Sequence, residues 1–114
     1  MGVIRKIFLL KKNNKVSYMT NLAEIKNTLS NHKTYLHNKY GLSLIAIFGS
    51  YSIGTQTEKS DIDILVDFER PIGIEFIDLA NELEKILNHK IDLVSKKGIK
   101  QKYYSFIEKK LNYV

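Results

Sequence analysis

The stretch from Gly49 to Val66, "GSYSIGTQTEKSDIDILV", joins a Gly-Ser turn to a strand-like run that contains two acidic residues. Alternate side chains of a strand point to the same face, so Asp61 and Asp63 are expected to lie together, about 6–7 Å apart along the backbone. Two ionised carboxylates at this spacing repel each other unless a positive charge lies between them. The packing of a strand does not need such a pair, so the rest of the sequence must show whether it serves binding or is a solvated strand face.

Apolar patterns outside this stretch predict the other elements of the fold. Spacings of three and four residues indicate helices, whereas short and nearly continuous apolar runs indicate buried strands. Asn21 with Glu24 resembles a capping box, and Gly41 is a natural helix end. We expect helices at 21–40 and 74–88, a last helix within 99–114, and strands at 42–48, 61–68 and 90–95. Alternating helices and strands predict the α/β (α+β) class.

The same patterns predict which side chains face the core. In the strand at 61–68, one face carries Ile62, Ile64 and Val66 and the other carries Asp61, Asp63, Leu65 and Asp67. The expected seam of the second helix consists of Phe76, Ile77, Ala80, Leu83 and Leu87. In the last helix we expect the inward residues to be Ile99, Tyr103, Phe106 or Ile107, and Leu111.

The other aromatic and histidine residues have ordinary structural interpretations. The three histidines show no metal-ligand spacing, and we expect His32, His37 and His89 at the surface or at helix ends. Tyrosines can stack on bases, but those near apolar seams are expected in a half-buried core. This group consists of Tyr40, Tyr103 and Tyr104, while Tyr113 is expected to be loose.

Length and charge bound the possible functions. A chain of 114 residues supports one core. The net charge of +6 divides into +5 over residues 1–18, −4 over 19–95 and +5 over 96–114. We therefore expect a basic N-terminal arm or extension at 1–18 and one domain at 19–114. The acidic centre suits a cation, and the basic ends suit an anionic partner. Because most of the excess lies in the arm, direct binding of nucleic acid is not expected.

Several cellular roles are excluded by missing signals. The chain contains no cysteine, so disulfides, thiolate metal sites and a cysteine nucleophile are absent. The apolar run "IFLL" near the N-terminus is too short for a signal peptide, and no later run is long enough to span a membrane. Lys6 stands where a myristoylation signal needs Ser or Thr. We expect a cytoplasmic protein without a membrane anchor.

Three further features bear on the two aspartates, which alone are most simply a solvated strand face. Gly49 and Ser50 follow a buried strand, where backbone N–H groups and a hydroxyl can contact phosphate. Gly54 and Ser60 lie in the loop before the pair, where Gly54 taken alone would indicate only loop flexibility. Asp92 lies in the third predicted strand and joins Asp61 and Asp63 if that strand is adjacent. Such a triad suits two-metal phosphoryl or nucleotidyl transfer.

The motif as a whole resembles a known family. "FGSYSIGTQTEKSDIDILVDF", followed by a helix and "KIDLVS", is similar to the minimal nucleotidyltransferases of the DNA polymerase beta-like superfamily. Their signature is Gly-Ser, a small turn with Gly, then Ser-Asp-x-Asp and a later single Asp in a strand. The resemblance covers roughly residues 20–110. It implies a small mixed β-sheet backed by helices, ATP as the nucleotide donor and Mg²⁺, with two ions expected, as the metal.

The resemblance also implies a partner and a role for each site residue. Many such proteins are antitoxins of a HEPN ribonuclease toxin and transfer AMP to a tyrosine of that toxin, in a hetero-oligomeric pair. Carried over by position, Gly49 and Ser50 would hold the triphosphate. Asp61 and Asp63 would hold the metals, and Asp92 would bind the catalytic metal and take the proton of the attacking hydroxyl.

The chain departs from the family pattern after the Gly-Ser turn. The family commonly has Arg there and another basic or small residue near the second Gly, where this chain has Tyr51 and Ile53. An Arg can pair with phosphate as a fork, whereas tyrosine offers one hydroxyl, so the departure bears on catalysis and not on the fold. Two alternatives follow: the affinity for triphosphate is weaker, or Lys59 or a lysine of the C-terminal segment supplies the charge.

Two other functions remain open at this stage. One is a binding antitoxin that neutralises its partner without catalysis. The other is a nucleotidyltransferase that acts on a small molecule, for which the chain lacks the usual second helical domain.

Overall fold

The structure, a computed structural model, describes residues 20–114, and the arm predicted at 1–18 lies outside this part. One four-stranded sheet has the order β3-β2-β1-β4. The strands are β1 (Leu42–Phe48), β2 (Ile62–Phe68), β3 (Ile91–Ser95) and β4 (Asn112–Tyr113). β2 pairs antiparallel with β1 and parallel with β3, while β4 pairs antiparallel with β1. The mixed sheet is confirmed, and the boundary between arm and domain stays a prediction.

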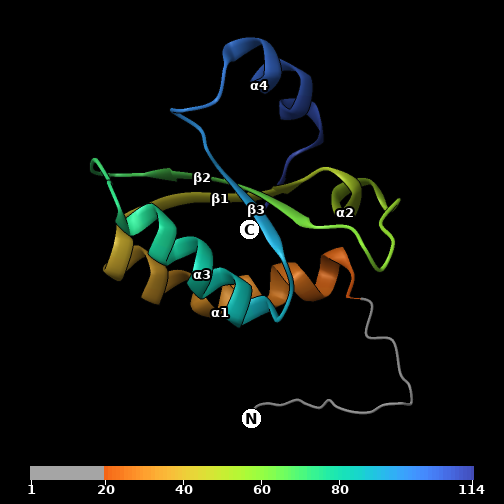
Figure 1. Cartoon of the computed structure of the whole chain (residues 1–114), viewed down its shortest axis with the longest axis horizontal. Helices are drawn as coiled ribbons and strands as arrows, with labels where there is room; N and C mark the ends of the chain where they lie inside the picture. The colour runs from red at the N-terminus through yellow and green to blue at the C-terminus, as the bar shows by residue number, and fades with distance from the viewer. Residues whose placement is uncertain (1–19) are drawn as a thin grey trace.

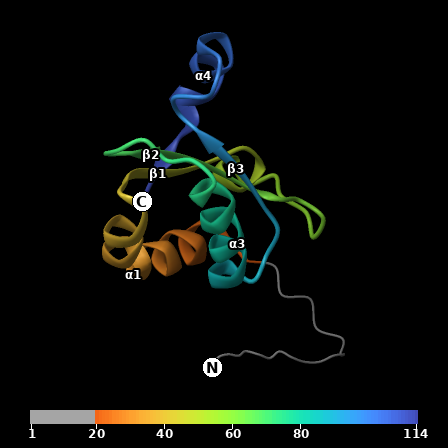
Figure 2. The same ribbon diagram turned by 60° about the vertical axis from the view of Figure 1, so that its left-hand side comes forward.

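Helices lie on both faces of this sheet. They are α1 (Leu22–Tyr40), α2 (Ser50–Ile53), α3 (Glu75–Leu87), α4 (Gln101–Ile107) and the 3-10 turn η1 (Glu108–Lys110). α1 and α3 pack together on one face, and α4 with η1 lies on the opposite side (Figure 1, Figure 2). None of the described helices combines the length and apolar character needed to cross a membrane.

The boundaries of α1 follow from its capping residues. The Asn21 side chain accepts a hydrogen bond from the Glu24 backbone N–H at 2.9 Å, as a capping residue does. Gly41 ends the helix with φ 72°, and its N–H donates to the His37 carbonyl at 2.8 Å. The predicted helix over 21–40 is confirmed. Its buried residues are Ile25, Leu29, Leu36 and Tyr40.

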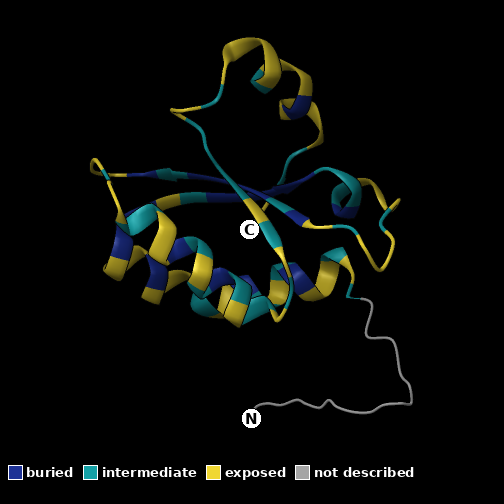
Figure 3. Ribbon diagram, viewed as in Figure 1, coloured by how far each residue is buried: buried dark blue, intermediate teal, exposed yellow. Residues whose placement is uncertain are grey.

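The two faces of β2 support two separate clusters. Ile62, Ile64 and Val66 are fully buried against the α1 and α3 layer, which confirms the predicted alternation. Leu65 faces the other way and packs with Phe48 and the C-terminal segment. Figure 3 shows the buried residues concentrated along the central strands and the inner sides of α1 and α3. The face beyond the helical layer therefore carries only a small apolar cluster, which leaves part of it open for a site.

The predicted seam of α3 is wrong at one position. Leu79 and Leu83 are fully buried, whereas Ile77 is 59% exposed. At about 100° per residue, Ile77 lies about 200° from Leu79 around the helix, so both cannot face the sheet. Leu79, which the prediction omitted, faces the core instead, and Phe76 packs against the core as predicted.

The C-terminal segment differs from the predicted single helix. α4 ends at Ile107, η1 follows, and the chain then returns to the sheet as β4. α4 contacts the sheet through Tyr104 and Ile107, three residues apart, so the intervening face turns outward. Tyr103 and Phe106 are therefore exposed, by 48% and 79%, and the prediction that Tyr103 faces inward is wrong. Tyr113, predicted to be loose, is half exposed but pairs with Ala46 in the sheet.

Candidate active site

The sheet brings two of the three predicted carboxylates side by side. Asp63 of β2 and Asp92 of β3 are register partners in the parallel pair. Neighbouring strands are about 4.8 Å apart, so both side chains leave the same face of the sheet at adjacent positions. Asp61 lies just before β2 and is exposed. The second and third strands are adjacent, which was the condition for Asp92 to join the pair, and this places the two acids on the face opposite α1 and α3.

Charge is crowded at this point. Burial, followed by the charges of Asp92 and Asp61, raises the pKa of Asp63 from 3.8 to about 6. Each of these causes disfavours the ionised carboxylate. A cation bound among these groups would relieve the repulsion between them, so the electrostatics of the site suit a positive ligand.

Gly49 brings the Gly-Ser turn against Asp63. Its backbone has φ 72°, in the left-handed region that glycine adopts without strain. A Cβ atom added at Gly49 would collide with Oδ2 of Asp63. The register pair Phe48 and Asp63 explains this closeness, because Gly49 directly follows Phe48. The turn and the carboxylate are thus in contact, and only glycine fits between them.

Ser50 begins the four-residue helix α2, which Gly54 ends. Ser50 is partly buried, and its carbonyl accepts a hydrogen bond from Thr55 N–H at 3.0 Å. Gly54 ends the helix in the left-handed conformation, with φ 79°, and a Cβ atom added there would meet no described neighbour. The predicted contribution of Gly54 is therefore structural.

Tyr51 points into the core. Its side chain is 2% exposed, and its hydroxyl lies 3.1 Å from Nε2 of His89. Nε2 is also 2.8 Å from the Ser60 carbonyl oxygen, which requires a donor, so we infer that Nε2 carries the proton. The two rings meet edge to face, with centroids 5.7 Å apart. Tyr51 is thus a core residue and not a phosphate ligand.

The contact between Tyr51 and His89 joins the three segments that make up the site. Tyr51 belongs to α2, Ser60 directly precedes Asp61, and His89 lies between α3 and β3. One residue further on, the Lys90 carbonyl accepts from Ile62 N–H at 3.0 Å. His89 was correctly expected near a helix end, but its bonding was missed. A histidine at that place in the sequence carries no signal of a contact with residues 51 and 60.

A second set of bonds ties α2 to the C-terminal segment. Ser52 Oγ donates to the Lys110 carbonyl at 2.6 Å, and the Asn112 side-chain amide donates to Ser52 Oγ. η1 is thereby held against the helix that follows Gly49. The contacts join residues about 60 positions apart, and no sequence pattern predicted them.

The donor set fits a hard divalent cation that also contacts a phosphate. Among residues 20–114, no three carboxylate, imidazole or thiol side chains gather into a complete metal cage. Mg²⁺ typically uses one or two carboxylates and completes its shell with water and substrate phosphates. Asp63 and Asp92 supply such a partial set.

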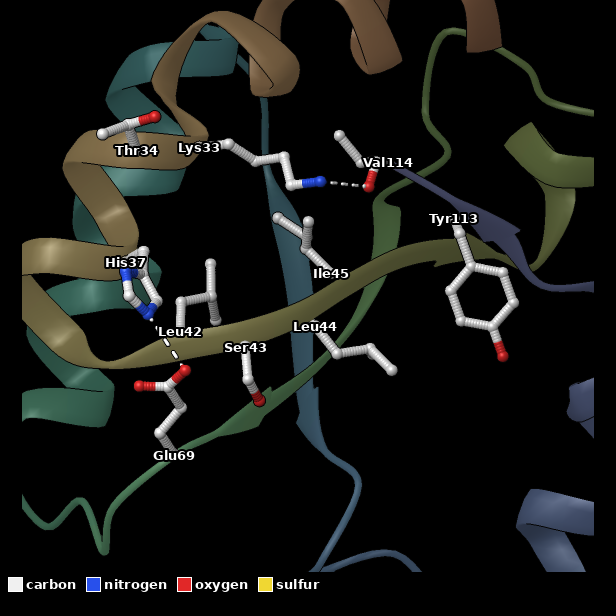
Figure 4. Close-up of a pocket in the computed structure, with 10 residues that line it drawn as sticks. All are labelled: Lys33, Thr34, His37, Leu42, Ser43, Leu44, Ile45, Glu69, Tyr113 and Val114. Carbon is white, nitrogen blue, oxygen red and sulfur yellow. Dashed lines mark hydrogen bonds and ion pairs between the residues drawn. The ribbon is translucent and has the colours of Figure 1, made fainter.

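A pocket of about 420 Å³ lies elsewhere, between α1 and the exposed edge of β1 (Figure 4). In this pocket His37 faces Glu69 at 3.1 Å, and Lys33 donates to the Val114 carbonyl at 2.9 Å. It is lined by Lys33, Thr34, His37, Leu42, Ser43, Leu44, Ile45, Glu69, Tyr113 and Val114. These residues do not include the predicted site residues, so the pocket is separate from the carboxylates.

A mixed sheet that carries paired carboxylates beside a Gly-Ser turn is the arrangement expected of a nucleotidyltransferase. Residues 29–114 match the family described as the nucleotidyltransferase domain, and the chain belongs to this family. Its substrate class is therefore a nucleotide.

Related proteins of known name point to a more particular group. Protein MJ1379 of Methanocaldococcus jannaschii, provisionally named a protein adenylyltransferase, is 48% identical over 100 residues, which cover 84% of this chain and 100% of that protein. Protein adenylyltransferase MntA of Thermococcus cleftensis is 40% identical over 97 residues, which cover 84% of this chain and 98% of that protein.

A solved structure has the same fold. One chain of a crystallised toxin–antitoxin complex with AMP-PNP is 32% identical and superposes with a TM-score of 0.64, covering 76% of this chain and 71% of that chain. The family resemblance drawn from the sequence motif is confirmed.

Proposed function

We propose that this protein transfers AMP from ATP to a tyrosine of a HEPN-type toxin and acts as the antitoxin of that partner. The observation that carries the proposal is the pairing of Asp63 with Asp92 across β2 and β3, directly beside Gly49. The relatives named protein adenylyltransferases support a protein acceptor. The related complex that contains AMP-PNP supports both ATP and a toxin partner.

In the proposed reaction, Gly49 and Ser50 hold the triphosphate, and Asp61, Asp63 and Asp92 hold Mg²⁺, with two ions expected. The metal, when bound, would neutralise phosphate charge and lower the pKa of the attacking hydroxyl. Asp63 fits this role because the crowding that raises its pKa is relieved by a cation.

The transfer itself requires a base and an acceptor in line with the α-phosphate. The tyrosine oxygen of the acceptor forms a bond to the α-phosphorus, the bond between the α-phosphorus and the bridging oxygen breaks, and pyrophosphate leaves. Asp92 accepts the proton of the hydroxyl. It suits this role because its side chain is exposed at the open side of the site, where an acceptor can reach it.

The cellular context belongs to the same proposal. ATP as the donor and a chain without cysteine support a cytoplasmic location. The tyrosine acceptor implies a hetero-oligomer with the toxin during the reaction.

The proposal is tested by incubating the protein with α-phosphate-labelled ATP, Mg²⁺ and its HEPN-type partner, for which the first protein to test is a helical product of the neighbouring gene. We expect the wild type to label the partner, and Asp63→Asn to reduce the rate at least about 100-fold because a ligand of the metal is lost. Asp78→Asn is the matched control, since Asp78 is an exposed acid on α3, across the sheet. Equal labelling by wild type and Asp63→Asn would refute the proposed role of this carboxylate.

One observation favours a second candidate, a binding antitoxin without catalysis. Tyr51 is in the core, so the chain offers no guanidinium at the position where the resembling family commonly has one. This candidate predicts that the toxin regains activity as soon as this protein is removed, whereas covalent AMP transfer predicts lasting inhibition. Assaying the toxin after separation under denaturing conditions and refolding, beside an unmodified toxin treated identically, decides between them.

A further inference from the structure

The outer face of α4 is an aromatic and basic surface. Tyr103 and Phe106 lie three residues apart on it, with 48% and 79% of their surface exposed. Lys102 lies four residues before Phe106, on the same side, and is exposed. A helix that packs through Tyr104 and Ile107 alone does not need two large rings on its solvent side. We call Lys102, Tyr103 and Phe106 the α4 outer face.

This face lies on the same side of the sheet as the carboxylates. Ile107 packs on Leu65, which is two residues beyond Asp63 along β2 and points to the same face. Figure 1 and Figure 2 show α4 standing out from the sheet, away from α1 and α3. A protein that presents a side chain to Asp63 and Asp92 would approach from this side, past α4.

The positive charge of the C-terminal segment, residues 96–114, indicates the kind of partner. Residues 96–114 contain six lysines and one acid, which gives +5, whereas residues 20–95 have a net charge of −4. The ion pairs Lys39–Glu82 and Arg70–Glu75 belong to the opposite, helical side. Acidic side chains on a partner would be attracted to this segment and would improve the rate of encounter.

The same charges argue against two other possible occupants of this face, a second copy of the protein and a nucleic acid. A second copy docked symmetrically through this face would bring the lysines of one copy against those of the other. An extended nucleic acid along the face would run onto Asp61, Asp63 and Asp92, whose negative charges repel any phosphate that is not bridged to them by a metal ion. Both arguments leave a protein with acidic groups as the occupant.

We propose that the α4 outer face docks the acceptor protein, through an apolar pocket bordered by acidic side chains on that protein. Phe106 and Tyr103 enter the pocket as aromatic anchors, and lysines of the segment pair with the acidic border. This inference rests on the proposed function, because the docked protein is the one that receives AMP.

The test compares variants of the α4 outer face with matched variants on α3. Phe106→Ser and Lys102→Glu change the proposed anchor and the proposed charge. Ile74→Ser and Lys85→Glu are the controls, because Ile74 is 80% exposed and Lys85 is an exposed lysine, both on the helical side of the sheet. Affinity for the purified helical product of the neighbouring gene is measured by titration calorimetry. The thermal shift given by Mg²⁺ with AMP-PNP reports the nucleotide site.

We expect Phe106→Ser to weaken partner binding at least about tenfold, as loss of an interface anchor does, and to leave the nucleotide-induced shift unchanged. Lys102→Glu should weaken binding less, and the controls should bind as the wild type does. The inference is overturned if Phe106→Ser binds the partner as tightly as the wild type does. It is also overturned if the wild type does not bind the partner at all. The inference is likewise overturned if Phe106→Ser keeps its affinity for the partner but loses binding to a single-stranded RNA 20-mer or loses self-association.

The outcome also separates this inference from the proposed function. If the partner binds through the α4 outer face but receives no AMP, docking stands and the transfer is wrong. If the partner is labelled by Phe106→Ser at the wild-type rate and affinity, the transfer stands and docking is wrong.

Discussion

Ionisation of Asp63 lowers the stability of the metal-free protein. Its side chain is half-buried, with Gly49 against one oxygen and two other acids nearby. An ordinary folding role would favour a neutral side chain there, because burial and like charges both oppose ionisation. A carboxylate kept in such surroundings is typical of a site that binds a cation or moves a proton.

Neutralising Asp63 should therefore stabilise the metal-free protein at high pH. The folded-state pKa of about 6 exceeds the ordinary value of 3.8, so the folded protein binds this proton more tightly than the unfolded chain. Its stability consequently falls as the pH rises from about 4 to about 6, and the penalty persists above that range. After allowance for solvent screening, we expect Asp63→Asn to gain about 1 kcal/mol at pH 8, or roughly 4–8 °C in Tm.

The pH dependence of the difference in Tm serves as a control for this prediction. The difference in Tm between Asp63→Asn and wild type should shrink as the pH falls through 6 and vanish near 4, when both side chains are neutral. Thermal unfolding in a chelator, followed by circular dichroism from pH 4 to 8, measures it, with Asp78→Asn as the comparison. A wild type that is as stable as Asp63→Asn at pH 8 would show that Asp63 is not under electrostatic strain.

The elements of the site are joined by a few contacts between distant segments. His89, next to β3, bonds the Ser60 carbonyl and meets the hydroxyl of Tyr51 in α2. The parallel register of β2 and β3 and the Gly49 turn alone do not fix the loop that carries Asp61. The hydrogen bonds of His89 connect that loop to α2 and to the start of β3, and so they hold the loop in position at the site.

Replacing His89 should loosen this loop. His89→Ala leaves a partly buried carbonyl without its donor, and we expect a loss of about 1–3 kcal/mol in the free energy of unfolding. His89→Ala should also slow AMP transfer. His89→Gln, which keeps a donor N–H at the end of the side chain, should recover part of the stability and part of the transfer rate. Urea titration measures the stability. His32→Ala is the control, because His32 contacts the Thr28 carbonyl at 2.8 Å within α1. Equal stability of His89→Ala and wild type would contradict this role of His89.

The sequence predicted the elements that have a strong period or clear ends. α1 has both caps, β1 is a nearly continuous apolar run, and β2 alternates apolar and acidic residues apart from Leu65, so their positions could be read directly. Asp63 and Asp92 could be placed in strands from the sequence, but their pairing could only be stated on the condition that the two strands are adjacent. Ile77 and Tyr103 were misplaced because a short helix allows more than one inward face. β4 and the contacts of His89 could not be predicted, because they depend on residues that only tertiary packing brings together.

The whole molecule has two unlike sides. One side is the helical layer of α1 and α3, which completes the main core. The other carries the carboxylates, the Gly49 turn and the basic segment of α4 and η1, over a small cluster around Leu65. Nucleotide, metal and acceptor would all meet on this second side. Because the domain is small, the surface that it offers to an acceptor beside the carboxylates is limited to the α4 outer face and its surroundings.

The most direct test of this account is the intact mass of the toxin partner after incubation with this protein, ATP and Mg²⁺. The partner is separated under denaturing conditions, weighed by mass spectrometry, and digested to locate the modified residue. We expect a mass gain of one or more AMP units on tyrosine with the wild type, and none with Asp92→Asn. An unmodified partner that is nonetheless neutralised by the wild type, or an equal gain with Asp92→Asn, would contradict AMP transfer through the Asp63 and Asp92 pair.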